Sequence, residues 1–305
     1  MGTTMIRPME WIAKQILDRV AANDLMYAAF QHSIGRGVGY VQHVRRLIEW
    51  NRDAVHAQVF LNDRISDLVV RHGPFRGMRY PQARSVGSTL VPKLIGSYEK
   101  ELHPVIDRIC NVPYTAIVDI GCAEGYYAIG LAMRISGATV YAFDTDAEAT
   151  ALCRAMAELN GVSSRVITGE FCSPETLASL DLGSRALIVC DCEGFEGTLF
   201  TKQTVGALAD HDVLVELHDF LDIELSSSIR EVFSESHDIH AVKSVDDLEK
   251  AHTYVYAELD GFDLASRKML LAERRPAVME WFFMTPSRGR PRHRSDDGSS
   301  SRRQA

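Results

Sequence analysis

The sequence predicts an open, doubly wound α/β fold around a mostly parallel, seven-stranded sheet. Beyond residue 113, short apolar segments alternate with longer segments of helical periodicity, as in a chain that forms strand and helix in turn. Segment 186–190 is apolar throughout, which is typical of a strand covered by helices on both faces. The last two strands are expected to meet antiparallel.

The expected elements follow in order along the chain. Residues 9–72 are expected to be helical, with a break at 35–39. The turn-rich segment 73–81 cannot be a long helix, and another helix is expected over 97–110. The expected strands are 115–120, 138–143, 165–168, 186–191, 212–217, 238–244 and 278–284. The expected helices that follow lie near 125–135, 146–160, 174–180, 197–209 and 224–235, and after the sixth strand only near 262–274.

Three parts are expected: a helical N-terminal cap region over residues 1–95, an α/β domain over 96–285 and a disordered basic tail over 286–305. The tail is too poor in apolar residues to offset the entropy lost on ordering. It holds six Arg and two Asp, a net +4, so the overall charge of −8 leaves −12 on residues 1–285. Because so acidic a body repels phosphate backbones, nucleic acid is not an expected partner.

The composition is that of an ordinary folded protein. The hydrophobic share is 46% and the charged share 24%, and no apolar run approaches the ~20 residues that span a bilayer. Residues 1–10 lack a basic region followed by an apolar stretch, so neither secretion nor membrane insertion is expected. Six cysteines without a CxxC pair indicate reduced thiols, and the expected location is therefore cytoplasmic.

The first predicted strand ends in a glycine-rich turn that is a candidate ligand site. It reads Asp119-Ile-Gly121-Cys-Ala-Glu-Gly125, in which the glycines permit a tight turn and the close approach of a ligand. The GxxxG spacing and the acidic residue before it disfavour a dinucleotide and suit a ligand that carries an ammonium group. Asp144 ends the second predicted strand, where a carboxylate can accept both hydroxyls of a ribose.

This combination of glycine turn and second carboxylate resembles class I methyltransferases that depend on S-adenosylmethionine (SAM) and have a Rossmann-like fold. The resemblance implies SAM as the cofactor, with Asp119 facing its ammonium side, Asp144 its ribose and Glu170 its adenine amino group. Glu170 as a solvated loop acid and Cys122 as a small packing residue remain open alternatives. The cofactor-binding residues that this resemblance implies are Asp119, Gly121, Cys122, Ala123, Gly125, Asp144 and Glu170.

Three further elements resemble the FkbM family of methyltransferases, over roughly residues 96–220. They are Gly96-Ser-Tyr98-Glu99, Asp191-Cys-Glu193-Gly194 and Glu216-Leu-His218. The resemblance implies that residues 96–285 form the methyltransferase domain. It also implies that Tyr98 and Glu99 contact SAM or the acceptor, and that Asp191 is a further cofactor contact.

The acceptor chemistry is expected where the fourth and fifth strands end. A hydroxyl acceptor must lose a proton, and His218 is the favoured general base because imidazole titrates near neutrality, with Asp191 and Glu193 as carboxylate alternatives. Glu216, two residues from His218 on the same side of the strand, could orient its ring. The less favoured alternative is a cluster of Asp191, Glu193, Glu216 and His218 that holds Mg²⁺ or Mn²⁺.

The sequence therefore predicts a methyltransferase that methylates a hydroxyl of a small molecule or glycan intermediate, with residues 1–95 capping the site. The alternative is a catalytically silent Rossmann-type binding module whose helical N-terminal region recruits a protein partner. The methyl acceptor is the expected partner, nucleic acid and membrane are not expected, and a homodimer is left open.

Overall fold

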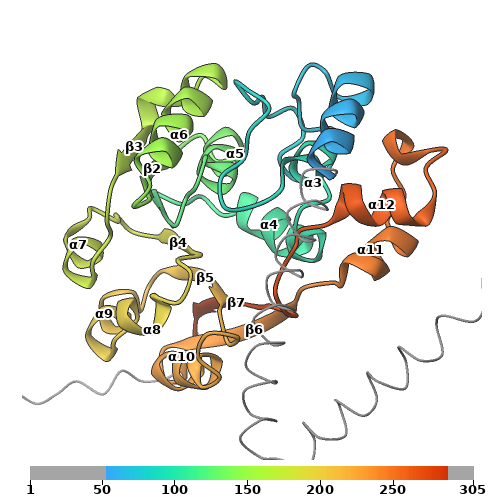
Figure 1. Ribbon diagram of the computed structural model, residues 1–305. Coiled ribbons are helices and arrows are strands. Elements are labelled where there is room, and N and C mark those ends of the chain that lie inside the picture. Colours follow the sequence, from blue (N-terminus) through green and yellow to red (C-terminus); the bar gives the residue numbers. More distant parts are fainter. Residues whose placement is uncertain (1–52, 288–305) are drawn as a thin grey trace, which may run out of the picture. The chain divides into compact units, whose positions relative to one another are not determined.

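The computed structural model describes residues 53–287 (Figure 1). The helices expected before residue 53, with their break at 35–39, and the disorder expected over 288–305 lie outside the described residues. The first two residues of the expected tail are ordered, because Pro286 ends a strand and Ser287 N–H donates to the carbonyl of Ser236. The chain divides into two compact units, residues 1–60 and residues 61–305. In the first unit the described residues 53–60 are helical, and the second unit contains the whole sheet.

The sheet has seven strands in the order β3-β2-β1-β4-β5-β7-β6, and all neighbours are parallel except β7, which lies antiparallel to both β5 and β6. The prediction of a mostly parallel, seven-stranded sheet with an antiparallel final pair is confirmed. The strands are β1 Ala116–Ile120, β2 Thr139–Phe143, β3 Val166–Gly169, β4 Ala186–Cys190, β5 Asp212–Leu217, β6 His237–Lys243 and β7 Glu280–Pro286.

Helices connect the strands and cover both faces of the sheet. They are α3 Leu90–Ile95, α4 His103–Cys110, α5 Tyr126–Arg134, α6 Ala147–Leu159, α7 Pro174–Ser179, α8 Glu196–Leu199, α9 Lys202–Ala207, α10 Leu225–Phe233, α11 Asp247–Thr253 and α12 Leu264–Leu271. None of the helices within residues 53–287 has the length and apolar character that crossing a bilayer requires.

The two faces of the sheet are buried against different helices. Val118 and Ile188 belong to one buried cluster with Leu199 of α8, Val205 of α9 and Phe233 of α10. Helix α5 packs against β1, β2 and β3, and Figure 1 shows α5 and α6 across the sheet from α8, α9 and α10. Burial on both faces explains why the central strands β1 and β4 are apolar with the exception of Asp119.

The strand order places a crevice at the carboxyl ends of β1 and β4. The chain runs outward from β1 through β2 to β3 and then returns to β4 on the other side of β1, so the connections diverge between these two strands. Residue Ile120 pairs with Phe143 of β2 and with Cys190 of β4, which brings the loops after all three strands together. Ligands of open α/β sheets bind at such a point.

Several helices differ from the sequence-based expectation. The helix expected over 97–110 begins only at His103, since Glu99 adopts a left-handed φ of 47° and a 3-10 turn follows it. The helix expected over 197–209 is two helices, because Thr201 caps a new one by accepting from Thr204 N–H. Residues 65–72 are not helical, and Val69 forms an isolated bridge with Arg79. Helix α11 was missed; it is short and is capped by Asp246.

Candidate active site

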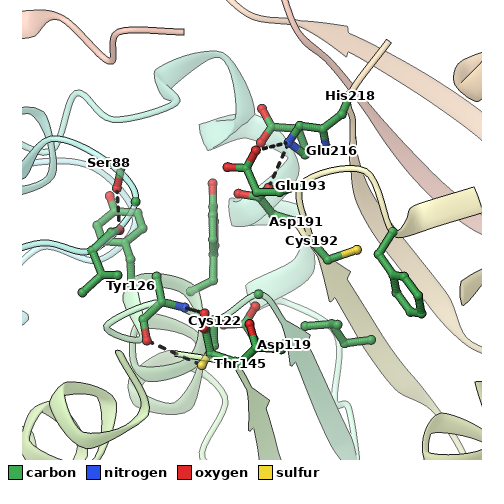
Figure 2. A pocket seen from close by; sticks show the side chains of 18 of the residues that line it. Ser88, Asp119, Cys122, Tyr126, Thr145, Asp191, Cys192, Glu193, Glu216 and His218 are labelled. Atoms are coloured by element: carbon green, nitrogen blue, oxygen red, sulfur yellow. Dashed lines mark hydrogen bonds and ion pairs between the residues drawn. The ribbon is translucent and has the colours of Figure 1, made fainter. Parts of the chain in front are cut away.

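A cavity of about 490 Å³ opens at the carboxyl ends of β1, β2, β4 and β5 (Figure 2). Its lining brings together most residues that the sequence assigned to a site, including Asp119, Gly121, Asp144, Glu170, Asp191 and His218. Figure 2 shows two ends: Asp119, Cys122 and Thr145 lie at one, and Asp191, Glu193, Glu216 and His218 lie at the other. We call these the glycine-loop end and the acidic end.

The glycines of the first loop are required by its backbone. Gly121 has a φ of +83°, and a Cβ there would lie 1.6 Å from the carbonyl oxygen of Asp191. Gly125, with a φ of +95°, is the N-cap of α5, and a Cβ there would lie 2.8 Å from Sγ of Cys153. Both positions therefore exclude a side chain, and the loop lies directly against the chain that leaves β4.

Asp119 is a buried carboxylate beside this loop. It accepts a hydrogen bond from Ala128 N–H, while its Oδ2 has no hydrogen-bond partner among the described residues. Burial raises the pKa of Asp119 to about 7, and the nearby carboxylates of Asp191 and Asp144 add to the shift. A buried oxygen without a partner at a cavity wall is suited to accept from a cationic ligand group.

Asp144 is fixed by backbone hydrogen bonds at the end of β2. Its Oδ2 accepts from Ala123 N–H at 2.8 Å, and its Oδ1 accepts from Asp146 N–H at 2.8 Å. Each carboxylate oxygen has a second lone pair, so the group can still accept from ligand hydroxyls. Asp146 in turn caps α6 by accepting from Glu148 N–H.

The remaining predicted cofactor residues lie around the same end. Cys122 is buried and lines the cavity with Ala123, whose φ of 47° is left-handed. Glu170 is exposed at the edge of the cavity. Its carboxylate can be solvated, like that of any loop acid, and can also reach a ligand in the cavity. Next to it the ring of Phe171 lies 5.3 Å from that of Phe195, and both rings line the cavity.

Helix α3 is attached to the glycine loop by a buried ion pair that the sequence analysis missed, and the segment before α3 adds hydrogen bonds. Lys93 Nζ lies 2.6 Å from Oε1 of Glu124, and both side chains are almost fully buried. Glu124 also accepts from Ser85 Oγ at 2.8 Å and from Val86 N–H at 3.0 Å. Residues 85–93 thus form a wall of the cavity, with Lys93 itself among the lining residues.

Tyr98 and Glu99 have different positions in the structure. Tyr98 lines the cavity, with its ring 5.3 Å from that of Tyr126. Glu99 is buried and is not among the described residues that line the cavity; its carboxylate accepts from the Tyr127 hydroxyl and from Arg275. Burial raises the pKa of Glu99 to about 7, against the lowering effect of Arg275. Glu99 therefore supports the wall from behind.

Arg275 joins three buried carboxylates and was not predicted from the sequence. Its guanidinium donates to Glu99, to Glu216 and, at 3.0 Å, to Oε2 of Glu273. Burial and the negative charge of Asp191 raise the pKa of Glu216 well above its ordinary value, although Arg275 opposes the shift. Arg275 lies between α12 and β7, in a segment without a recognisable motif.

His218 is oriented by Glu196, not by Glu216 as the sequence analysis proposed. Nδ1 of His218 lies 2.8 Å from Oε1 of Glu196, a fully buried carboxylate at the start of α8. The same oxygen accepts from the N–H groups of Cys192 and Gly194 at 3.3 Å. Glu216 is instead bonded to Arg275. The carboxylate spacing Asp191-x-Glu193-x-x-Glu196 is the signal that could have identified Glu196.

The other ring nitrogen of His218 faces two carboxylates (Figure 2). Nε2 lies 3.5 Å from Oδ1 of Asp191 and 3.5 Å from Oε2 of Glu193. Burial lowers the pKa of His218, but the hydrogen bond to Glu196 and the charges of the three carboxylates outweigh it and raise the pKa. The raised pKa favours the imidazolium, which is not a proton acceptor.

The structure gathers three of the four residues in the alternative metal set. Asp191, Glu193 and His218 each offer a ligand atom, and these atoms lie within 4.8 Å of one another. Glu216 is not in this group, and its carboxylate accepts from Arg275. The four-residue set of the sequence analysis is therefore corrected to three.

Comparisons with known proteins match the central part of the chain. Residues 105–189 match the family model described as "Methyltransferase small domain". A protein of Pyrobaculum calidifontis named "Probable cobalt-precorrin-6B C(15)-methyltransferase (decarboxylating)" is 37% identical over 73 residues, which cover 24% of this chain and 37% of that protein. The chain thus spans little more than a third of the length of that relative.

Two of the similar solved structures are methyltransferases of Geobacter. The precorrin-6y C5,15-methyltransferase of Geobacter metallireducens has a TM-score of 0.40 and 12% identity, over 65% of this chain and 92% of that one. A SAM-dependent methyltransferase of Geobacter sulfurreducens, solved with S-adenosyl-L-homocysteine, has a TM-score of 0.40 and 17% identity, over 62% and 91%. The family match contains the glycine loop and runs from before β1 into β4, and it indicates a methyltransferase-type domain over this part of the chain.

Proposed function

We propose that this protein transfers the methyl group of SAM to a hydroxyl of a small molecule or glycan intermediate. The observation that carries the proposal is one cavity with two chemically different ends, each built at strand ends. The glycine-loop end offers the groups that a SAM molecule requires. The acidic end offers ionisable groups that can take part in proton removal.

The residues at the glycine-loop end fit SAM. The unpartnered Oδ2 of Asp119 can accept from the ammonium group, and the fixed carboxylate of Asp144 can accept from the ribose hydroxyls. Gly121 leaves the loop open where a Cβ could not fit, and Glu170 at the edge can accept from the adenine amino group. When bound, SAM supplies an electrophilic methyl group on a sulfonium.

The acidic end is assigned to the acceptor. A hydroxyl becomes a competent nucleophile when its proton leaves, and positioned side chains typically contribute 10²–10⁴-fold to such proton transfers, as an order-of-magnitude range. His218 acting alone as base is disfavoured, because its pKa is raised and its Nε2 faces carboxylates. We therefore assign activation of the hydroxyl to Asp191, Glu193 and His218 as a unit, with Glu196 as the positioning residue for the ring.

The FkbM-like elements support this assignment at a finer level. Tyr98 and Asp191 line the cavity from the first and second elements, and His218 lines it from the third. Elements far apart in the sequence therefore converge on the cavity where the resemblance implies contacts to SAM and acceptor. A catalytically silent binding module would not require these side chains to converge.

Calorimetry with S-adenosylhomocysteine and SAM tests the proposal. We expect binding by the full chain and a large loss of affinity in Asp144→Ala, whereas Asp181→Asn, an exposed carboxylate outside the cavity lining, serves as a control with unchanged affinity. Incubation with SAM and a metabolite extract, followed by mass detection of products heavier by one methyl group, then identifies the acceptor. A folded protein that binds neither nucleoside would refute the proposal.

A second readout separates the enzyme from the silent module. If the protein is an enzyme, His218→Gln should keep its affinity for S-adenosylhomocysteine and lose methyl transfer by roughly 10²–10⁴-fold. If the chain only binds a partner, the same variant should behave as the wild type in every assay.

A further inference from the structure

Three side chains with metal-ligating atoms converge at the acidic end of the cavity. Asp191 and Glu193 follow β4, and His218 follows β5, so two neighbouring strand ends supply the group (Figure 2). Their ligand atoms all lie within 4.8 Å of one another. Since these residues also line the cavity, whatever binds between them is accessible to the acceptor.

The distances in this cluster are too long for good hydrogen bonds. Nε2 of His218 lies 3.5 Å from each of two carboxylate oxygens, whereas a charge-assisted N–H···O bond is about 2.7–2.9 Å long. Two neighbouring ligand atoms in the octahedral geometry that Mg²⁺ and Mn²⁺ prefer, each about 2.1 Å from the metal, are separated by about 3.0 Å. The observed 3.5 Å is therefore closer to the spacing of ligand atoms around a common cation than to the length of a direct hydrogen bond.

The orientation of His218 is a second, independent indication. Its side chain is 3% exposed, and its Nδ1 is committed to the buried Glu196 at 2.8 Å. Because a carboxylate only accepts, Nδ1 carries a proton, so a cation that displaces the proton of Nε2 would meet the lone pair of that nitrogen. Histidine ligands of metals are commonly held in this way by a carboxylate behind the ring.

An orphaned oxygen points to the same place. Oδ1 of Asp191, the atom that lies 3.5 Å from Nε2, is buried and has no hydrogen-bond partner among the described residues. Buried carboxylate oxygens are nearly always paired, so this atom lacks a partner that a bound cation would supply. Glu193 completes the group from the exposed side, on a backbone with a left-handed φ of 53°.

We propose that Asp191, Glu193 and His218 bind a divalent cation, with Mn²⁺ as the preferred ion. Two carboxylates and one imidazole combine the oxygen ligands that Mn²⁺ and Mg²⁺ favour with a nitrogen ligand that suits Mn²⁺ better. Three protein ligands leave coordination positions for water or an acceptor oxygen. A hydroxyl bound there would lose its proton more easily. This role rests on the proposed function, whereas binding of the cation does not.

The test measures the binding of Mn²⁺ itself. Full-length protein is treated with EDTA, freed of chelator and titrated with MnCl₂, with free Mn²⁺ followed by electron paramagnetic resonance. We expect one site per chain, competition by Mg²⁺ and Zn²⁺, and a loss of affinity of at least tenfold in Glu193→Gln and His218→Gln. Glu196→Gln, which changes the group that holds the ring and the N–H groups of Cys192 and Gly194, should weaken binding by about 10–100-fold. Glu224→Gln, an exposed carboxylate before α10, should bind as the wild type does.

The outcomes separate this proposal from the proposed function. Binding of S-adenosylhomocysteine is measured on the same samples and reports that each variant is folded. Wild-type protein that binds the nucleoside but not Mn²⁺, Mg²⁺ or Zn²⁺ would overturn the cation site alone, as would Mn²⁺ binding that Glu193→Gln and His218→Gln leave unchanged. Mn²⁺ binding without nucleoside binding would instead reject the proposed function and leave the cation site standing.

Discussion

The two ends of the cavity are held by different kinds of contact. At the glycine-loop end, the N–H groups of Gly121 and Cys122 donate to the carbonyl of Phe143, and Ala123 N–H donates to Asp144. At the acidic end, charged side chains bond to one another, with Arg275 bonded to three carboxylates and His218 bonded to Glu196.

Because of this difference, we expect the two ends of the cavity to be sensitive to different kinds of substitution. Backbone contacts persist when a side chain is replaced, provided that the new residue can adopt the same φ and ψ. A buried network of charges depends on every member, because each group left alone keeps its desolvation penalty. We therefore expect the acidic end to respond most to changes of charge, and the glycine-loop end to respond most to changes of backbone shape.

Replacement of Arg275 should have the largest effect on stability. In Arg275→Gln the carboxylates of Glu99, Glu216 and Glu273 stay buried without their shared guanidinium. Loss of one partner of a buried ion pair costs about 3–5 kcal/mol, so we expect a decrease of this size in the free energy of unfolding at pH 8. Denaturation with urea measures it.

The same variant has an expected pH dependence and a matched control. Without Arg275 the pKa of Glu99, already raised to about 7 by burial, rises further above its value in the unfolded chain. The folded state then binds the proton more strongly, so the deficit should shrink as the pH falls from 8 to 5. Arg71→Gln breaks an exposed pair with Asp67 and should cost less than about 1 kcal/mol. Equal losses in both variants would contradict the comparison.

Addition of a methyl group at Gly121 tests the glycine-loop end of the cavity. In Gly121→Ala the Cβ meets the carbonyl oxygen of Asp191 and the backbone must leave its φ of +83°, so we expect a loss of about 2–4 kcal/mol in stability. Gly137→Ala is the control, because a Cβ there has nothing within 4 Å. Thermal unfolding followed by circular dichroism compares the two variants. Similar melting temperatures for both would show that the loop can move away from β4.

Ionisation of Asp119 should control the affinity for the nucleoside. Burial raises its pKa to about 7, so the carboxylate that we propose as acceptor for the ammonium group forms as the pH rises through that value. If only the ionised form binds, affinity for S-adenosylhomocysteine should increase about tenfold between pH 6 and pH 8. Calorimetry across this range measures the slope. Asp119→Asn should bind weakly and without the slope, and a slope that survives in this variant would assign the titration to another group.

The smallest expected effect is at the exposed edge of the cavity. Glu170→Gln removes a charge that solvent already screens, so affinity for S-adenosylhomocysteine should fall only severalfold, about 0.5–1 kcal/mol. Glu158→Gln, an exposed carboxylate on α6, provides the baseline. Affinities that agree within error would return Glu170 to the role of a solvated loop acid.

Hydrophobic periodicity and the local spacing of residues were sufficient to predict the fold and the residues of the glycine-loop end. Apolar strands and amphipathic helices repeat along the chain, and a loop between two paired strands follows directly from them, so Asp119, Gly121 and Asp144 could be predicted. Errors occurred where elements are short, as in α11, or where one capping residue divides a helix, as Thr201 does.

The acidic end was only partly predictable because its contacts join remote segments. Arg275 bonds to Glu99, 176 positions away, and to Glu216, 59 positions away, and no local pattern encodes such pairs. Glu216 lies near the end of β5 and His218 directly follows the strand, which suggested that one orients the other, but each takes its partner from elsewhere. Residue identity located the cluster, and tertiary packing decided which side chains meet.

Strand β7 determines when this end can assemble during folding. It inserts between β5 and β6, and the segment between α12 and β7 contains Glu273 and Arg275. The glycine-loop end needs only β1, β2 and β4, all formed by residues before 191. The carboxylates of Glu99 and Glu216, in contrast, have no guanidinium as a partner until residues 273–286 have emerged from the ribosome and docked. A nascent chain lacking β7 would therefore have its glycine-loop end in place before the Arg275 network of its acidic end can form.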